Sequence, residues 1–252
     1  MEQDLTTGSV FKRIVYFSLP YLLSYFLQTL YGMADLFITG QFYGVDTITA
    51  VSNGSQIMHM MTVIIVGLAM GTTVTIGHSV GAKCMEQAEK IIGNTITLFM
   101  GIAVAFTVIL VVLVKPIVVL IATPQEAVAG TSIYLLICFI GIPFITAYNI
   151  ISSIFRGLGD SKSPMYFIGI ACVMNIALDY LFMGAFHMGA AGAALGTVCA
   201  QTFSVLVALW VIRRRKTGIS LKKSDFKIER AVIGQVLKIG IPVALQDGFI
   251  QV

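Results

Sequence analysis

Two acids stand inside stretches of sequence that are otherwise long enough and apolar enough to cross a lipid bilayer. Asp35 lies in the run 14–39, and Asp179 lies in the run 164–186, one helical turn after Asn175. An ionisable group in a membrane helix costs about 2.5–3.5 kcal/mol on insertion scales, so each acid needs a compensating partner. We interpret both carboxylates as functional, because hydrogen bonds that only hold helices together do not require them.

The spacing of these residues predicts one shared site. Each acid is expected about five residues before the end of its helix, and both helices run in the same direction, so the depths are similar. Thr197, on the returning helix 190–212, falls at the matching depth. Two carboxylates, the Asn175 amide and a hydroxyl form a set of hard oxygen ligands, which suits Na⁺ or a proton shared between the acids.

Polar residues at helical spacing indicate a cavity inside the bundle. Helix 14–39 carries one polar stripe, and two further stripes lie on 49–77 and 190–212. For the residues without charge, interhelical hydrogen bonding is the alternative role, and the Gly192–Gly196 pair is expected to serve close helix packing. The three stripes are Ser24, Gln28, Tyr31 and Asp35; Thr49, Asn53, Gln56 and His59; and Thr197, Gln201 and Ser204.

The composition predicts an all-α polytopic membrane protein. The 252 residues are 57% hydrophobic and 11% charged, whereas a soluble domain carries about 25% charged residues. Backbone exposed to lipid must satisfy its own hydrogen bonds, which favours helices. The third span is long enough to include a re-entry or interfacial turn around Lys115 and Pro116. Six spans are predicted, over 14–39, 49–77, 91–121, 131–155, 164–186 and 190–212, and a seventh begins near 232.

The basic residues predict the orientation. Fifteen of the 16 lysines and arginines fall on one side of the predicted spans, and Lys115 alone falls on the other. This asymmetry places the N-terminus and the basic loops in the cytoplasm of a multi-pass protein of the cell membrane. The net charge of +4 therefore needs no nucleic-acid partner. We interpret the run "RRRKTGISLKK" at residues 213–223 as a solvated cytoplasmic segment, an interpretation that overlaps with contact to anionic lipid headgroups.

A weak internal repeat predicts a second lobe. Aligning Pro20 with Pro242 also pairs Val10 with Val232, and six helices separate the two copies, so both enter the membrane in the same direction. We expect the chain to be the first half of a larger transporter that lacks its C-terminal lobe. The expected parts are a six-helix lobe over 1–212, a basic cytoplasmic linker over 213–231, and the first helix of the second lobe over 232–252.

Three segments resemble the multidrug and toxic compound extrusion (MATE) family. They are "SLPYLLSYFLQTLYGMADLFITG", "VGAKCMEQAEK" and "FRGLGDSKSPM", at residues 18–40, 80–90 and 155–165. The resemblance implies the N-terminal lobe of a twelve-helix fold with two six-helix lobes. It also implies export of organic cations or drugs in exchange for Na⁺ or H⁺ by alternating access.

The family's cation site in this lobe falls on the same four residues, Asp35, Asn175, Asp179 and Thr197. Pro20 is expected to kink the first helix where it bends as the site changes occupancy, and it matches the family's bending proline. Tyr31 and Tyr134 resemble tyrosines that line the cavity, and Gln28 is assigned to the same lining. Apart from a coupling ion, Na⁺ or H⁺, we expect no cofactor.

Three alternatives remain from the sequence. A flippase for lipids or lipid-linked precursors shares the wider superfamily; a cationic cavity would favour it, but no basic residue is expected within a span. A truncated half that does not transport is the second, since the cleft between two lobes cannot form within one lobe. An intramembrane enzyme is least favoured, because we find no acid cluster for Mg²⁺-pyrophosphate, no paired histidine motif and no nucleophile with a base.

Overall fold

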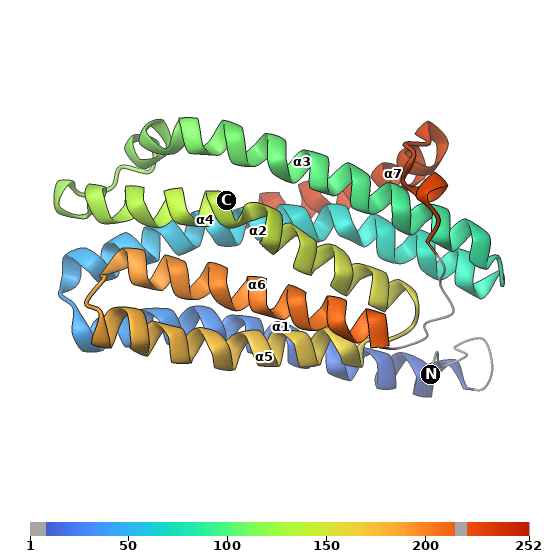
Figure 1. Cartoon of the computed structure of the whole chain (residues 1–252), viewed down its shortest axis with the longest axis horizontal. Helices are drawn as coiled ribbons and strands as arrows, with labels where there is room; N and C mark the ends of the chain where they lie inside the picture. Colours follow the sequence, from blue (N-terminus) through green and yellow to red (C-terminus); the bar gives the residue numbers. More distant parts are fainter. Residues whose placement is uncertain (1–8, 215–220, 252) are drawn as a thin grey trace.

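The computed structural model describes residues 9–214 and 221–251, and the described part consists of helices without strands. The predicted all-α fold class is confirmed. The N-terminal residues 1–8 and residues 215–220 of the predicted linker lie outside the described residues, as does Val252. The elements in Figure 1 are α1 (Val10–Phe42), α2 (Val45–Gly81), α3 (Met85–Leu120), α4 (Gln125–Gly157), α5 (Lys162–Asp179), the π-helical segment η1 (Tyr180–Ala185), α6 (Ala190–Arg214), the 3-10 turn η2 (Lys223–Phe226) and α7 (Arg230–Gln251).

Five helices of the described part, α2 to α6 with η1 counted as part of α5, are long and apolar enough to cross a membrane. The sequence predicted six spans, and α1 makes the difference. Its 33 residues extend over about 50 Å, which is sufficient length. It carries several tyrosines and a polar stripe, and it is not among the five. The number of clearly apolar spans is therefore five, although α1 runs beside α5 along the bundle (Figure 1).

The helices alternate in direction and form a bundle in which α2 and α4 are central. α2 packs against α4 and α7, α4 also contacts α3 and α6, and α1 packs mainly against α5. The start of α1, the α2–α3 and α4–α5 turns and the described part of the linker lie at the same end (Figure 1). We call this the basic end, because it carries Lys83, Lys162 and the linker lysines.

The predicted turn around Lys115 and Pro116 is wrong. α3 continues as one helix through both residues to Leu120. Proline lacks the N–H that would bond to the carbonyl four residues earlier, here that of Val112. This position lies near the end of the helix, where few turns follow that a kink could displace. The chain reverses only afterwards, at Ala122, whose φ is 49°.

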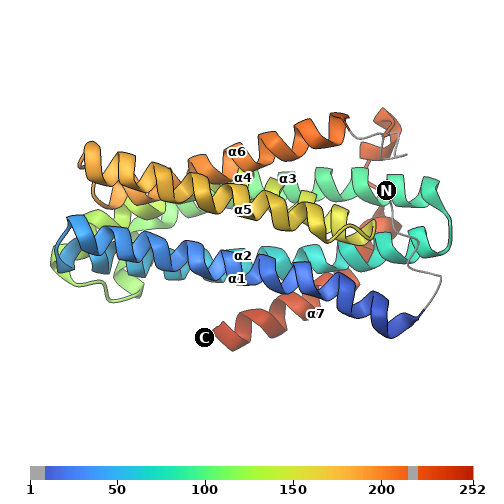
Figure 2. The same ribbon diagram turned by 90° about the horizontal axis from the view of Figure 1, so that it is seen from below.

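Small residues bring α7 against α2 along a narrow seam. A Cβ added at Gly67 would lie 2.6 Å from the Cα of Ala244, and one added at Gly71 would overlap the Val236 carbonyl oxygen. On the α7 side, a Cβ at Gly240 would overlap the Leu68 carbonyl. Such small residues at four-residue spacing allow backbones to approach closely. The seam holds α7 in place beside the bundle, and Figure 2 shows α7 lying along α2.

The part of the linker that follows the run 213–223 is docked against α3. Asn94 on α3 donates from Nδ2 to the Asp225 carbonyl at 3.1 Å and accepts from the Glu229 amide at 2.6 Å. The Thr97 hydroxyl donates to the Phe226 carbonyl at 3.0 Å, and Asp225 is buried. Asn94 and Thr97 form the hydrogen bonds that water would otherwise make to this part of the linker backbone. The backbone groups therefore stay satisfied when the segment packs against α3.

Replacing Asn94 with Leu is expected to release this docked segment. The variant loses both hydrogen bonds to the linker, each worth about 1 kcal/mol and more where a buried group is left unpaired. Tryptic cleavage after Lys223 and Lys227 should accelerate about tenfold, while cleavage after Lys83 in the α2–α3 turn serves as the internal control. Unchanged cleavage after both linker lysines would show that the docking does not depend on Asn94.

Candidate functional site

The structure brings Asp35, Asn175, Asp179 and Thr197 together from three helices. Thr197 on α6 donates from Oγ1 to Asp35 Oδ2 on α1 at 3.3 Å, and Asn175 Nδ2 donates to Asp179 Oδ1 along α5 at 3.4 Å. Asp35 also lies within hydrogen-bonding reach of both Asp179 and Asn175. Asp35 is 2% exposed, and Asn175 and Asp179 are fully buried. The two acids therefore share one enclosed cluster, which we call the acid site.

Three oxygens of the acid site accept no hydrogen bond from the described residues. They are Asp35 Oδ1, Asp179 Oδ2 and Asn175 Oδ1. Carboxylate and amide oxygens can only accept, so the group that satisfies them must be a donor or a cation. Buried polar groups are almost always satisfied, because leaving one unpaired costs about 1–3 kcal/mol. The donor chemistry of this set fits a proton or a small hard cation such as Na⁺.

The acid site is not a cluster of the kind that binds transition metals. No group of three or more His, Cys, Asp and Glu side chains converges anywhere in the described ranges 9–214 and 221–251. Its oxygens come instead from two carboxylates, one amide and one hydroxyl.

Two tyrosines line the acid site. The Tyr31 hydroxyl is buried near Thr197 and Asp35, and Tyr134 on α4 is 2% exposed and faces the same acids. The Tyr134 ring lies directly over Gly54 on α2, where an added Cβ would overlap the ring. Gly54 thus leaves the space that the Tyr134 ring occupies.

Gly196 makes room for the Asp179 carboxylate, a feature that the sequence analysis missed. A Cβ added at Gly196 would overlap Asp179 Oδ1 and would lie 3.5 Å from Asn175 Nδ2. We had interpreted Gly196 with Gly192 as a helix-packing pair. Gly192 does fill that role, since its Cβ would meet Met183 at 3.0 Å. The signal in the sequence was the position of Gly196 immediately before Thr197, a predicted site residue.

A π-helical segment begins immediately after Asp179. It covers Tyr180–Ala185, and such segments widen a helix by one extra residue and occur frequently at functional sites. Tyr43 supports it from the end of α1: its hydroxyl donates to the Met183 carbonyl at 3.0 Å and accepts from the Gly189 amide at 2.9 Å. The sequence predicted an uninterrupted helix over 164–186, because a π segment has no distinct hydrophobic period.

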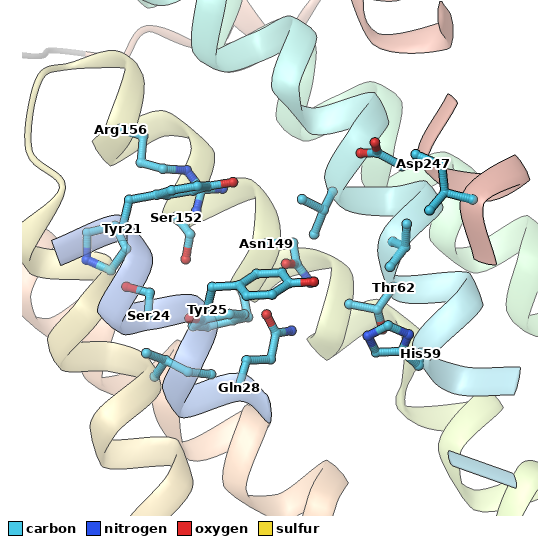
Figure 3. Close-up of a pocket in the computed structure, with 16 residues that line it drawn as sticks. Tyr21, Ser24, Tyr25, Gln28, His59, Thr62, Asn149, Ser152, Arg156 and Asp247 are labelled. Carbon is cyan, nitrogen blue, oxygen red and sulfur yellow. The ribbon is translucent and has the colours of Figure 1, made fainter. Parts of the chain in front are cut away.

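The residues of the α1 polar stripe are divided between the acid site and a separate cavity. Tyr31 and Asp35 face the acid site, whereas Ser24 and Gln28 line a cavity of about 300 Å³ nearer the basic end (Figure 3). His59 on α2 lines that cavity, while Gln56 is exposed and joins neither place. Gln28 therefore lines this cavity and does not belong to the acid site.

Other predicted residues have structural contacts. Pro20 is buried within an unbroken α1, and its carbonyl accepts a hydrogen bond from the Ser24 hydroxyl at 2.8 Å. Ser204 on α6 donates to the Phe167 carbonyl on α5 at 2.8 Å, which is the interhelical role considered for it. Gln201 is buried, and its Oε1 has no partner among the described residues.

The basic residue Arg156 lines a cavity, although it lies outside the predicted span 131–155. Arg156 belongs to the last turn of α4 and not to the following loop, and its side chain lines the cavity shared with Ser24 and Gln28 (Figure 3). The helix continues to Gly157 because nothing before the glycine disfavours helical backbone. The motif "FRGLGD" therefore spans the helix end, and the arginine points inward from it.

Comparison with known proteins identifies the family. The MatE family model matches residues 20–181. A probable multidrug resistance protein of Bacillus subtilis, YpnP, is 34% identical over 244 residues, covering 96% of this chain and 54% of that protein. The multidrug export protein MepA of Staphylococcus aureus is 26% identical and covers 94% of this chain and 53% of its own length.

Solved structures agree in fold. A multidrug resistance MATE family transporter in an outward-facing conformation superposes with a TM-score of 0.88 at 25% identity, covering 95% of this chain and 53% of that one. A MOP superfamily transporter from Pyrococcus furiosus gives 0.90 at 25% identity, covering 97% and 54%. The chain spans about half the length of the relatives that it matches. The match of the family model to most of a multi-pass helical membrane chain shows that this protein belongs to the MATE family of transporters.

Proposed function

We propose that the chain is the N-terminal lobe of a secondary active antiporter that exports organic cations or drugs in exchange for Na⁺ or H⁺. The observation that carries this proposal is the convergence of three unpartnered buried oxygens from Asp35, Asn175 and Asp179. A small cation can contact all three oxygens at once, and a shared proton can bridge the two carboxylates, which repel each other while both are charged. The basic end faces the cytoplasm of the cell membrane in this proposal.

Binding at the acid site would couple to the position of α1. Asp35 belongs to α1, whereas the other three residues belong to α5 and α6. A bound proton or cation attracts Asp35 toward α5 and α6. Its release leaves the Asp35 and Asp179 carboxylates both charged, and their repulsion pushes α1 away from α5. Ion binding and release would therefore shift the preferred position of α1. Alternating access requires such a coupling between occupancy and conformation.

Pro20 supplies a place where α1 can bend. Its ring lacks the N–H that would bond the Tyr16 carbonyl, so one hydrogen bond of the helix is missing there. Pro20 lies 15 residues before Asp35, about 22 Å along the axis. A bend at Pro20 would therefore swing the acid-bearing half of α1 as one arm.

The names of the relatives support the class of cargo. YpnP and MepA are described as a multidrug resistance protein and a multidrug export protein. Each is about twice the length that this chain spans, so a second lobe is the partner that we propose for the central cleft. In this proposal the lipid bilayer surrounds both lobes.

The coupling ion is tested by removing the hydroxyl ligand. In the protein at its full encoded length, efflux of ethidium from vesicles is measured under an imposed Na⁺ gradient and, separately, under a pH gradient. Thr197→Ala should lower Na⁺-driven efflux about tenfold because one ligand is lost, whereas a shared proton needs only the acids. Asp35→Asn should remove efflux under either gradient. Wild-type efflux that ignores both gradients would contradict the antiport proposal.

A flippase for lipids or lipid-linked precursors is the second candidate. The observation that favours it is Arg156, whose charge lines the cavity at the basic end. Transfer of a fluorescent phospholipid between leaflets of reconstituted vesicles separates it from ethidium efflux. Lipid transfer without ethidium efflux would select the flippase.

A further inference from the structure

The cavity at the basic end is separate from the acid site. We call it the arginine pocket; its volume is about 300 Å³, and α1, α2, α4, α5 and α7 line it. None of the four acid-site residues is among its lining residues. Ser24 and Gln28 lie 11 and 7 residues before Asp35 on α1, so the pocket is about 10–16 Å nearer the basic end. Its volume is at the lower end for small-molecule sites.

Arg156 places a positive charge on one wall of this pocket. Its guanidinium carbon lies 5.4 Å from the ring centre of Tyr21, and Nη2 donates to the Ser153 hydroxyl at 3.1 Å. Arg156 Nε is buried and has no hydrogen-bond partner among the described residues. The Tyr21 ring and the Ser153 hydroxyl hold the guanidinium in position at the wall of the pocket.

The groups around Arg156 do not neutralise it. The titratable side chains nearest to it are the phenols of Tyr21 and Tyr148, and no carboxylate of the described residues is among them. A partly desolvated cation without a counter-ion is costly, and the fork of an arginine matches a carboxylate or phosphate best.

The wall of the pocket opposite Arg156 carries an acid. It carries Asp247 from α7, with His59 and Thr62 from α2, and Figure 3 shows Asp247 across the pocket from Arg156. Tyr25 and Gln28 lie between the two walls. A ligand whose anionic group meets Arg156 therefore extends past an aromatic ring toward a carboxylate. An aromatic or cationic remainder suits that direction.

We propose that the arginine pocket binds the anionic group, a carboxylate or a phosphate, of an amphipathic molecule, with the Arg156 guanidinium as its partner. This inference rests on the proposed transport function. The pocket would then be the part of the cargo site that binds acidic groups, and the protein would accept compounds with a carboxylate or a phosphate as well as organic cations. Two sources share this chemistry: a soluble amphipathic acid, and the headgroup of a phospholipid.

Binding of a matched pair of probes tests the proposal. The protein at its full encoded length is purified in a non-ionic detergent, and calorimetry at fixed ionic strength measures binding of 2-naphthoate and of 2-naphthylmethylammonium. Arg156→Gln should weaken naphthoate binding about ten- to a hundredfold, the range for a lost charge-assisted hydrogen bond. Arg156→Lys should keep part of the affinity, because it retains the charge and loses the fork.

The controls separate recognition from a structural role. Arg213→Gln removes the same charge at an exposed position of the same end and should leave naphthoate binding unchanged. Equal weakening of both probes by Arg156→Gln and Arg156→Lys would assign Arg156 to helix packing and overturn the proposal, as would naphthoate binding that is unaffected. Asp179→Asn should remove ion-driven efflux and leave naphthoate binding intact. Efflux therefore tests the antiport proposal, and naphthoate binding tests the pocket proposal independently.

Competition distinguishes the two sources of the anionic group. Dihexanoyl phosphatidate and 4-butylbenzoate are each titrated against bound naphthoate. Displacement at lower phosphatidate concentration supports a lipid headgroup, and displacement at lower butylbenzoate concentration supports a soluble acid. If neither displaces naphthoate, the probe does not occupy a site for acidic amphipathic molecules, and the proposal fails.

Discussion

Asp179→Asn is expected to abolish ion-driven efflux while the protein still folds. The substitution keeps the shape of the side chain and removes its charge. Hydrogen bonds to charged groups are worth about 1.5–3 kcal/mol, so the affinity for a coupling ion should fall about ten- to a hundredfold. An amide also cannot share a proton with Asp35. The loss should therefore appear under both a Na⁺ gradient and a pH gradient.

Thermal stability gives the second readout of this variant. Asp35 and Asp179 lie within hydrogen-bonding reach of each other and are both buried, so removing one charge removes repulsion. The midpoint of thermal unfolding should stay the same or rise in ion-free buffer at alkaline pH. Asp46→Asn, at the exposed first turn of α2, is the matched control: it should leave efflux unchanged and should not raise the midpoint, because an acid at a helix N-terminus is favourable. Normal efflux by Asp179→Asn would refute the role of the acid site.

Gly196→Ala is expected to disturb the acid site as strongly as changing an acid. The added methyl group would occupy the position of Asp179 Oδ1, so the carboxylate must rotate away from Asn175 and Asp35 or the α5–α6 spacing must increase. Overpacking of this kind costs typically about 1–3 kcal/mol. Efflux should fall at least about tenfold, because ion ligands must be held to within a fraction of an ångström.

Gly32→Ala is the control for this substitution. Gly32 lies on α1, one turn before Asp35, and a Cβ there would meet nothing within 4 Å. It should leave efflux unchanged and stabilise α1 by up to about 1 kcal/mol, the difference in helix propensity. In an Asp179→Ala background, Gly196→Ala should no longer lower the midpoint of unfolding, since the colliding carboxylate is gone. An equal loss of stability in both backgrounds would mean that Gly196 only packs helices.

The amino-acid sequence by itself determined which residues have polar chemistry and where each lies along its helix. Apolar runs of about 20 residues define membrane helices, and a carboxylate within such a run is costly enough to indicate a function. The direction of each helix then gives the depth of Asp35, Asp179 and Thr197. Their convergence in one site follows from depth and helix face alone. Hydrophobic length and helical period are local properties, so a sequence reports them directly.

The tertiary structure alone decided how the helices meet. Which stripe residues face the acids, and that Gln28 lines the arginine pocket instead, depends on the rotation of α1 against its neighbours. The space that Gly196 leaves for Asp179 depends on the distance between α5 and α6. The inward position of Arg156 depends on where α4 ends, and the docked linker depends on Asn94 reaching it from α3. Contacts between distant segments are set by packing of whole helices, and packing leaves no periodic signal in the residues that make it.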